Sequence, residues 1–348
     1  MARKATSQDV ANRAGVSRSA VSFVLNGRAD GNIAKDKQLR ILAAAKELNY
    51  TPNAVARSLQ AQRTHTIGVV TDTIAGGPFA GELLQGASSA AFDAGYLLLV
   101  IETQNQEARE NSAFTMLLDR QVDALVFAAE SMRPHTPHPA MHGVPAVLAN
   151  CFDPEGGLRS VMADEVAGGR SATQILLDSR HINIAYLSGP LDAVAAQRRT
   201  EGFDTAIAAS GRPPIKAVET GWDINDGYAA AMRLFSDDGG HSPKHDRPTG
   251  VVCANDRVAL GVMLACARLG LRVPEDLSIV GYDNHDPLAK TTVPGLTTVA
   301  IPHREMGEKA VEILLGELSN GIRKESSGTV LIPCPVVMRG SVAAPPLR

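Results

Sequence analysis

Residues 7–26, SQDVANRAGVSRSAVSFVLN, contain two short helical patterns separated by the turn Ala14–Val16. Thr6 or Ser7 stands where a side-chain oxygen caps the first amides of the first helix. The glycine at the centre of the turn ends that helix, because glycine adopts a left-handed conformation without a Cβ penalty. Ser17 is placed to cap a second helix immediately afterwards. The stretch therefore predicts a helix, a tight turn and a second helix.

The second helix has an apolar face and a polar face. At about 100° per residue, one side carries Ala20, Val21, Val24 and Leu25, which predicts that this side packs inward. The other side carries Arg18, Ser19, Ser22, Phe23 and Asn26. Arginine binds guanine O6 and N7, serine and asparagine bind base edges or phosphates, and phenylalanine covers thymine methyl groups. The outer face therefore suits a DNA major groove, and an ordinary solvated helix pair is the alternative.

The charge of the 348-residue chain is unevenly distributed. Residues 1–65 contain 11 Lys and Arg against 4 Asp and Glu, a net charge of +7, so the rest of the chain carries −10 of the total of −3. A basic N-terminal segment on an acidic body is expected of a protein that binds nucleic acid phosphates with one end only. Basic tails can also be inert, but this one has apolar helical periodicity.

The length predicts two or three domains. The chain has no run of about 18 apolar residues, and its N-terminus, MARKATSQDV, lacks the apolar core of a signal peptide. We therefore expect a soluble cytoplasmic protein with no membrane partner. The cysteines are far apart and lack CxxC spacing, which favours buried free thiols at Cys151, Cys253, Cys266 and Cys334.

Residues 33–50 form a third helical pattern, which predicts a three-helix headpiece over residues 1–50. The residues spaced to close it are Leu39, Leu42, Ala45 and Leu48. Residues 51–65 follow as a linker that contains one further short helical run, NAVARSLQ, at 53–60. Eight residues are too few to hold a helix alone in water, so we expect this run to fold only when something pins it.

From Thr66 the sequence alternates apolar runs with helical patterns, which predicts a parallel α/β fold over residues 66–348. Two such sets occur, so we expect two doubly wound subdomains that face a cleft. The first comprises about 66–163 and 303–328, and the second about 164–299 and 329–348. Later crossovers near residues 294–304 and near Ser326 would connect the two as hinges.

Three segments carry a resemblance to a known family: DVANRAGVSRSAVSFVLNG at 9–27, ILAAAKELNYTPNAVARSL at 41–59 and RTHTIGVV at 63–70. In order and spacing they resemble the LacI family of bacterial transcription regulators. The resemblance extends to Arg339 and implies a helix-turn-helix headpiece, a hinge helix and a core similar to periplasmic sugar-binding proteins. It also implies a homodimeric repressor of a palindromic double-stranded DNA operator. A small-molecule effector, a sugar or sugar derivative, would control operator binding.

The resemblance assigns the DNA contacts residue by residue. Base readout falls to Arg18, Ser19 and Phe23. Relatives often have arginine or histidine where this chain has Phe23, so a thymine-methyl contact is expected in place of a guanine contact. Phosphate or minor-groove contacts fall to Ser17, Ser22, Asn26, Asn32, Asn53, Ala56, Arg57 and Leu59. The leucine at 59 would enter the central base step where two hinge helices pair.

Ligands of open α/β folds bind beyond the carboxyl ends of the strands. The residues there that match the family's effector pocket are Phe79, Asn150, Arg199, Trp222, Asn255 and Asp283. Carboxylate, amide and guanidinium groups satisfy sugar hydroxyls, and an aromatic ring can lie against a sugar face. We expect Arg199 and Asp283 to be the main anchors. As alternatives, Arg199 forms a surface ion pair, the lone tryptophan is core, and Asp256 is a helix N-cap.

Enzymes and metal proteins are the rival classes. The segment TDTIAGGP at 71–78 lacks the Lys-Ser/Thr of a P-loop and the GxGxxG spacing of a dinucleotide site, so we expect neither catalysis nor a cofactor. The histidine-containing segments 130–143 and 236–248 lack carboxylate or cysteine partners at ligand spacing, which favours surface loops over metal sites. A stand-alone sugar-binding protein would need an export signal and no headpiece.

Overall fold

The computed structural model describes residues 5–27, 29, 32–51, 58, 63–73, 80–213, 215, 217–235, 247–320 and 327–346. The chain divides into two compact units, Met1–His65 and Thr66–Arg348. Each unit has its own hydrophobic core.

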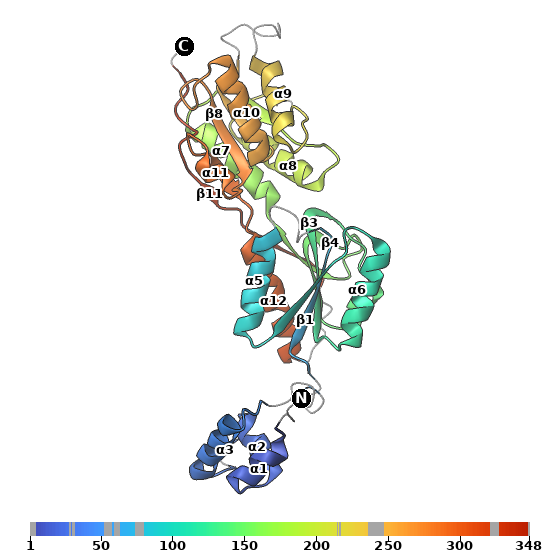
Figure 1. The fold of residues 1–348 in the computed structure, drawn as a ribbon. Coiled ribbons are helices and arrows are strands. Elements are labelled where there is room, and N and C mark those ends of the chain that lie inside the picture. Colours follow the sequence, from blue (N-terminus) through green and yellow to red (C-terminus); the bar gives the residue numbers. More distant parts are fainter. Residues whose placement is uncertain are drawn as a thin grey trace. The chain divides into compact units, whose positions relative to one another are not determined.

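The first unit contains three helices, α1 (Ser7–Ala14), α2 (Arg18–Leu25) and α3 (Lys35–Glu47), as Figure 1 shows. Thr6 caps α1 in a reciprocal arrangement with Asp9, and α1 ends at Gly15 with φ of 67°. Ser17 caps α2 by accepting a hydrogen bond from the amide of Ala20. The predicted helix, turn and helix are therefore confirmed, with Thr6 and Ser17 capping the two helix starts and Gly15 ending the first helix.

The core of this unit differs from the prediction on α3. Leu39 and Leu42 are 68% and 50% exposed, whereas Ile41, Ala44 and Ala45 are buried against α1 and α2. The expected set was spaced every three residues, and such a set drifts around the helix by about 60° at each step. Positions 41, 44, 45 and 48 keep one face, so the prediction of a core position for Leu39 and Leu42 was wrong.

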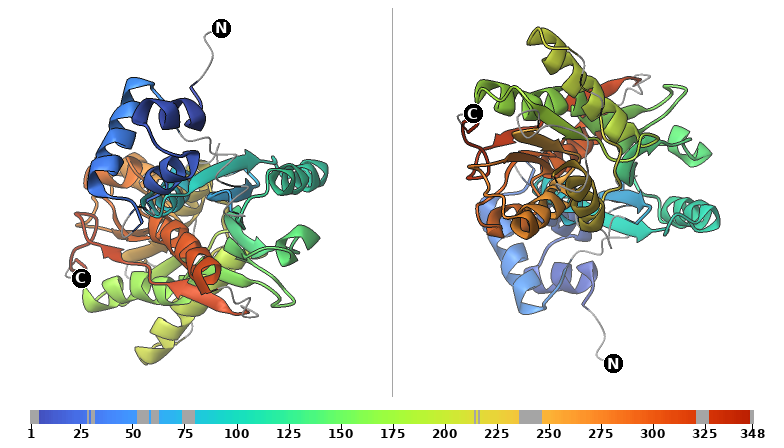
Figure 2. Two further views of the ribbon diagram at one scale, coloured as in Figure 1. Left: turned by 90° about the horizontal axis from the view of Figure 1, so that it is seen from below. Right: turned by 90° about the horizontal axis from the view of Figure 1, so that it is seen from above.

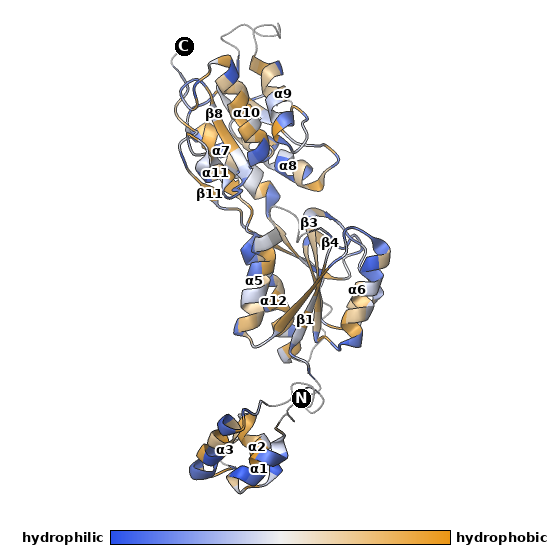
Figure 3. Cartoon of the chain, viewed as in Figure 1, coloured by the Kyte–Doolittle hydropathy of each residue, from blue (hydrophilic) through white to orange (hydrophobic). Residues whose placement is uncertain are grey.

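The second unit begins with a six-stranded parallel sheet in the order β10-β5-β4-β3-β1-β2. Its strands are β1 (Thr66–Thr71), β2 (Leu97–Glu102), β3 (Ala124–Pro134), β4 (Ala146–Phe152), β5 (Arg159–Ala163) and β10 (Thr329–Ile332). Helices α5 (Ala80–Asp93) and α12 (His303–Asn320) lie on one face, and α6 (Glu107–Asp119) lies on the other (Figures 1 and 2). Because helices lie on both faces of this sheet, its strands are expected to be hydrophobic. Figure 3 shows that they are.

The second sheet has the order β11-β9-β8-β7-β6, in which only β11 is antiparallel. Its strands are β6 (Ile184–Leu187), β7 (Gly250–Cys253), β8 (Ser278–Asp283), β9 (Thr297–Ala300) and β11 (Val336–Val337). Its helices are α7 (Glu165–Asp178), α8 (Val194–Ala209), α9 (Ile224–Phe235), α10 (Asp256–Leu269) and α11 (Leu288–Thr291). The α/β fold with two parallel sheets is as predicted.

The chain passes between the two sheets three times, after β5, after β9 and after β10. Strand β10 pairs with β5 in the register Thr329↔Ser160, so residues 329–332 complete the first sheet. The predicted assignment of residues 329–332 to the second subdomain was therefore wrong. The cause is not local, because the apolar, β-branched run at 329–332 pairs with β5, about 170 residues earlier in the chain, before the chain crosses back.

Three helix pairs pack with glycine against glycine. A Cβ atom on any of these glycines would lie 2.0–2.3 Å from a backbone oxygen of the partner helix, so only glycine permits the observed approach. The pairs are Gly86 and Gly307 in α5 and α12, Gly169 and Gly202 in α7 and α8, and Gly227 and Gly261 in α9 and α10.

The segment 130–143 is less loop-like than its composition predicted. Residues 130–134 continue β3, and Pro139–His142 form a short 3₁₀ helix, η2, in which Met141 is buried. His135 stacks on Phe127 with ring centroids 3.6 Å apart. Burial, followed by the charge of Arg133, lowers the pKa of His135 to about 4. The expected surface loop is therefore wrong for half of the segment, because the apolar groove beside β3 accepts a neutral imidazole.

Most of the second histidine segment, residues 236–246, lies outside the described residues. In the described part of the chain, no group of three or more His, Cys, Asp or Glu side chains is placed to hold a metal ion. None of the described helices is long and apolar enough to cross a membrane. All four cysteines are buried free thiols, as predicted.

Candidate functional site

The outer face of α2 is one candidate site. Arg18, Ser19 and Phe23 are all solvent-exposed, and 42% of the Phe23 surface is open to water. The Arg18 side chain contacts the first residue of α1, because its Nε donates a 3.1 Å hydrogen bond to Ser7 Oγ. An exposed aromatic ring beside an arginine and a serine gives this face apolar, cationic and hydroxyl groups within two helical turns.

The structure describes only some of the other predicted DNA contacts. Ser17 is the N-cap of α2, and Asn26 Nδ2 donates to Ser22 Oγ at 3.1 Å, so these polar groups also stabilise the helix ends. Asn32 is exposed. The hinge positions lie outside the described residues, so the structure says nothing of Asn53, Ala56, Arg57 and Leu59.

The second candidate site is a cavity of about 310 Å³ between the two sheets of the second unit. It is lined from the first sheet by β3 and β4 and from the second by α8 and β8, with α7 and α12 contributing their first residues. Five of the six predicted effector residues line this one cavity: Asn150, Arg199, Trp222, Asn255 and Asp283. The sixth, Phe79, lies outside the described residues.

Arg199 is the most densely bonded side chain of the cavity. Its Nε and Nη2 donate to both carboxylate oxygens of Glu165 at 2.8 and 3.0 Å, and its Nη1 donates to the carbonyl of Ala254 at 2.6 Å. Nη2 also lies 3.5 Å from Asp283 Oδ1. The guanidinium stacks on Tyr282 at 3.9 Å. Arg199 is therefore a buried clamp rather than the surface pair considered from the sequence, and most of its five N–H groups are already used.

Two of the lining residues have left-handed backbone conformations that are rare outside glycine. Asn150 lies in the second half of β4 with φ of 56°, and Asp283 is the last residue of β8 with φ of 101°. The Asn150 amide donates to the carbonyls of Ala129 and Glu130, both at 3.1 Å, which holds its side chain against β3. Such a conformation costs about 1–3 kcal/mol per residue and is found most often at binding sites, where the surrounding structure holds the backbone in place.

Asp283 is a buried carboxyl group at the floor of the cavity. Burial raises its pKa well above the usual range, and the nearby Arg199 charge opposes that rise. A carboxyl group in this setting gains from any ligand hydroxyl or N–H that donates to it, because the donor stabilises its charged form.

Asn255 is used differently from the prediction. Its Oδ1 accepts from the amide of Val258 as the N-cap of α10, and its Nδ2 donates to the carbonyl of Trp222 at 3.0 Å. The neighbouring Asp256 is therefore not the cap. It accepts from Thr298 Oγ1 at 2.6 Å and the His285 amide at 2.7 Å, and burial raises its pKa to about 6.

Four further titratable residues line the cavity and were not predicted: Glu130, Glu165, Arg257 and His303. Glu165 follows β5 and His303 follows the crossover after β9, so the rule that polar residues beyond strand ends form the site could have found both. Burial lowers the pKa of His303 to about 4, while the Glu165 charge raises that pKa slightly and the Arg199 charge lowers it slightly. This imidazole is therefore neutral near pH 7.

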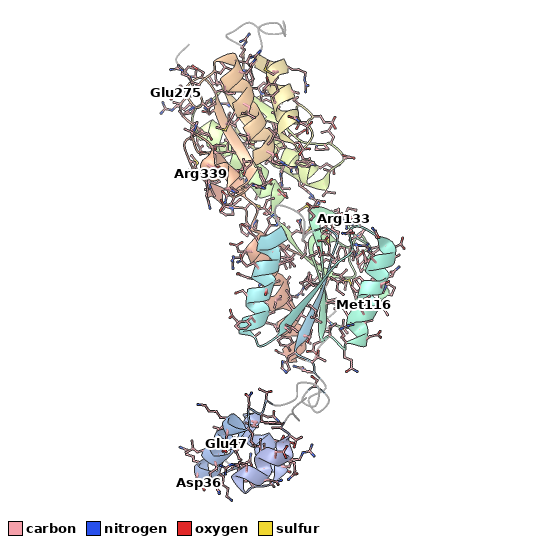
Figure 4. The ribbon with its side chains drawn as sticks, viewed as in Figure 1. Asp36, Glu47, Met116, Arg133, Glu275 and Arg339 are labelled. Atoms are coloured by element: carbon pink, nitrogen blue, oxygen red, sulfur yellow. The ribbon has the colours of Figure 1, made fainter. Side chains whose placement is uncertain are left out.

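The charges of the cavity favour a neutral ligand with many hydroxyl groups. Three carboxyl groups, from Glu130, Glu165 and Asp283, face two guanidinium groups, from Arg199 and Arg257. Arg257 is itself paired with Asp223 at 3.0 Å. Arg133, which is labelled in Figure 4, pairs with Asp72 at 3.2 Å and is not among the residues that line the cavity. The cavity therefore offers no excess of positive charge to a phosphate.

Comparison with known proteins gives consistent matches for both units. Residues 6–53 match the model for bacterial regulatory proteins of the lacI family, and residues 173–342 match a periplasmic binding protein-like domain. The ribose operon repressor of Escherichia coli (strain K12) is 35% identical over 320 residues, which cover 90% of this chain and 93% of that protein. The HTH-type transcriptional repressor PurR of Vibrio vulnificus (strain CMCP6) is 34% identical over 91% and 92% of the two chains.

A solved structure matches the whole chain as well. The lac repressor dimer bound to operator and the anti-inducer ONPF superimposes with a TM-score of 0.77 at 29% identity. The match covers 98% of this chain and 100% of that one.

Proposed function

Because this chain belongs to the LacI family of bacterial regulatory proteins, we propose that it is a transcriptional repressor that binds a palindromic operator as a dimer and releases it when a small molecule binds. The observation that carries this proposal is the cavity between the two sheets, which collects five residues expected to hold an effector. The same chain presents Arg18, Ser19 and Phe23 on an exposed helix. The two features together make a DNA reader with a ligand site.

We assign base readout to Arg18, Ser19 and Phe23, and contacts to phosphates or the minor groove to the remaining predicted positions of the headpiece and hinge. The major groove admits one helix, and the exposed face of α2 offers a guanine donor and a thymine-methyl contact. In the hinge, Leu59 would enter the minor groove, and bending the duplex there costs a few kcal/mol that new contacts offset.

We infer that the effector is an uncharged sugar or sugar derivative. Asp283 is the best-placed anchor, because its buried carboxyl group faces the cavity and most Arg199 donors are occupied. Arg199 then positions Asp283 and Glu165 and keeps one N–H for a ligand hydroxyl. The ring of Trp222 lies in the lining, where it offers an apolar surface to a sugar face.

The switch follows from where the cavity lies. Both sheets contribute to its lining, so a ligand that contacts both favours one angle between them. Strand β1 begins at Thr66, directly after the hinge segment, so a rotation of the first sheet moves the hinge with it. Unpaired hinge helices are too short to be stable, which couples ligand to DNA by about 1–3 kcal/mol in either direction.

We place the dimer contact at the edge of the first sheet. Strand β2 is an edge strand, and three large apolar side chains on it and at the end of α5 are exposed: Phe92, Leu97 and Val100. An exposed apolar edge strand favours association with another chain. In the proposed dimer, a second copy of this chain covers these three apolar side chains.

The repressor assignment implies that the protein is not an enzyme and acts in the cytoplasm, on the bacterial nucleoid. The relatives to which it is similar are named as repressors. We therefore assign no catalytic residue and no cofactor.

Titration of operator binding tests the proposal. An operator is first selected from randomised duplexes with the full-length protein, and its affinity is then measured with added D-ribose, D-glucose and hypoxanthine. We expect one of the sugars to weaken operator binding by about 5- to 150-fold. Asp283→Asn should bind the operator as wild type does but lose most of this response. A variant that responds like wild type would place the effector elsewhere.

A separate prediction concerns base readout. Replacing Phe23 with arginine should change the preferred base at one position of each half-site, because arginine binds guanine O6 and N7 where phenylalanine contacts a thymine methyl. The expected discrimination is about 1–3 kcal/mol at that position. Sequencing of operators selected by the two proteins measures it, and an unchanged preferred sequence would show that Phe23 reads no base.

A further inference from the structure

A second cavity of about 160 Å³ is present beside the effector cavity. Its lining is mixed: Asp153, Ser160, Arg198 and Thr329 contribute polar groups. The apolar side chains are Met132, Phe152, Leu158, Met162 and Val194. Of these, Phe152 and Met162 line this cavity and not the effector cavity.

The two cavities share the elements that line them. In β4, Asn150 lines the effector cavity and Phe152 lines the second one. In α8, Arg199 lines the effector cavity and the preceding Arg198 lines the second. Consecutive helix positions differ by about 100°, so the two cavities flank the same turn of α8.

Met132 is the residue that lines both cavities from β3. Its side chain is 7% exposed. The register between β3 and β4 is irregular between Ala128 and Arg133, and such an irregularity turns the intervening side chains away from the regular strand direction. A methionine at this point is unbranched and fills an irregular gap without polar demands.

We propose, on the basis of the sugar-responsive function proposed above, that Met132 is a partition that limits the effector to a single sugar ring. With its side chain removed, the cavity that contains Asp283 opens into the cavity that contains Phe152 and Met162. The joined space then accepts a glycoside, with the sugar ring beside Asp283 and an apolar aglycone beside Phe152 and Met162. Met132 thereby determines specificity for ligand size.

The test compares Met132→Ala with Met162→Ala, because Met162 lines the second cavity but not the effector cavity. Calorimetry of the full-length proteins measures binding of D-ribose, D-glucose and their phenyl β-glycosides. We expect Met132→Ala to bind a phenyl glycoside about tenfold more tightly than wild type, since the ring leaves water. Because Met132 also lines the effector cavity, the readout is the ratio of the phenyl-glycoside affinity to the free-sugar affinity, which should rise about tenfold in Met132→Ala. Met162→Ala should keep the wild-type ratio.

A crystal structure of Met132→Ala gives a readout that needs no ligand, with Met132→Val as a milder variant if alanine prevents folding. One continuous cavity supports the partition, and two separate cavities closed by a neighbouring side chain overturn it. Equal gains in the Met132 and Met162 variants overturn it as well. If no protein binds any of the sugars, the sugar assignment of the proposed function fails, while the crystal structure still decides the role of Met132.

Discussion

Arg199→Ala is expected to lower the free energy of unfolding by about 3–5 kcal/mol, because it leaves the buried carboxyl groups of Glu165 and Asp283 without their cation. The side chains of all three residues are at most 6% exposed, so water cannot replace the lost partner. The carbonyl of Ala254 also loses its donor. Urea unfolding of the effector-free protein measures the loss.

The loss of unfolding free energy in Arg199→Ala should be larger at high pH than at low pH. Burial raises the pKa of Asp283 and the Arg199 charge opposes that rise, so removing Arg199 raises the pKa further. A carboxyl group whose folded pKa exceeds its unfolded value favours folding at low pH, and this contribution is lost as the pH rises through the folded pKa. Arg199→Ala should therefore be less destabilised at pH 5 than at pH 8, and a deficit that does not change with pH would contradict the explanation.

Arg257→Ala provides a matched control. Arg257 lines the same cavity, but its ion pair with Asp223 is exposed, with side chains 35% and 71% open to water. Exposed pairs contribute about 0–1 kcal/mol. If both arginine variants lose similar stability, the loss at Arg199 does not come from stranded buried charge.

Arg199 shows what could and could not be predicted of the site. Its place in the effector site was predicted from the family resemblance, and it does line the cavity, although it lies within α8 rather than at a strand end. Its main partner, Glu165, lies 34 residues away on another helix, so no local pattern links the two. The sequence therefore indicated a ligand anchor where the structure has a clamp that uses most of its donors on the protein itself.

The elements of the fold were predictable where their causes are local. The caps Thr6 and Ser17 bond to residues three positions away, and the strands are continuous apolar runs, so both appear in the sequence. Strand β10 was misplaced because its partner, β5, lies about 170 residues earlier in the chain. The prediction for α3 was wrong because a set spaced every three residues drifts around the helix, whereas Ile41, Ala44 and Ala45 share the face that is buried.

The glycine pairs also could not be predicted from the sequence, because each depends on contact with a partner helix. Substitution of one of these glycines gives the second large expected effect. Gly307→Ala in α12 is expected to cost about 3 kcal/mol of stability, the upper end of what overpacking usually costs. The new Cβ would lie 2.0 Å from the carbonyl oxygen of Leu83 and 2.8 Å from the amide of Ala87 in α5. Both neighbours are backbone atoms, so no rotamer change relieves the clash, and the two helices must separate.

Gly316→Ala in the same helix should have the opposite effect. Gly316 is exposed, and a Cβ there would meet nothing within 4 Å. Alanine is therefore expected to stabilise α12 by about 0.5–1 kcal/mol, since glycine loses more backbone entropy on folding. Urea unfolding of the two variants and wild type gives the comparison, and a loss of similar size at both positions would mean that close helix packing is not the cause. Because His303 begins α12 and lines the effector cavity, Gly307→Ala should also weaken ligand binding, whereas Gly316→Ala should leave it unchanged.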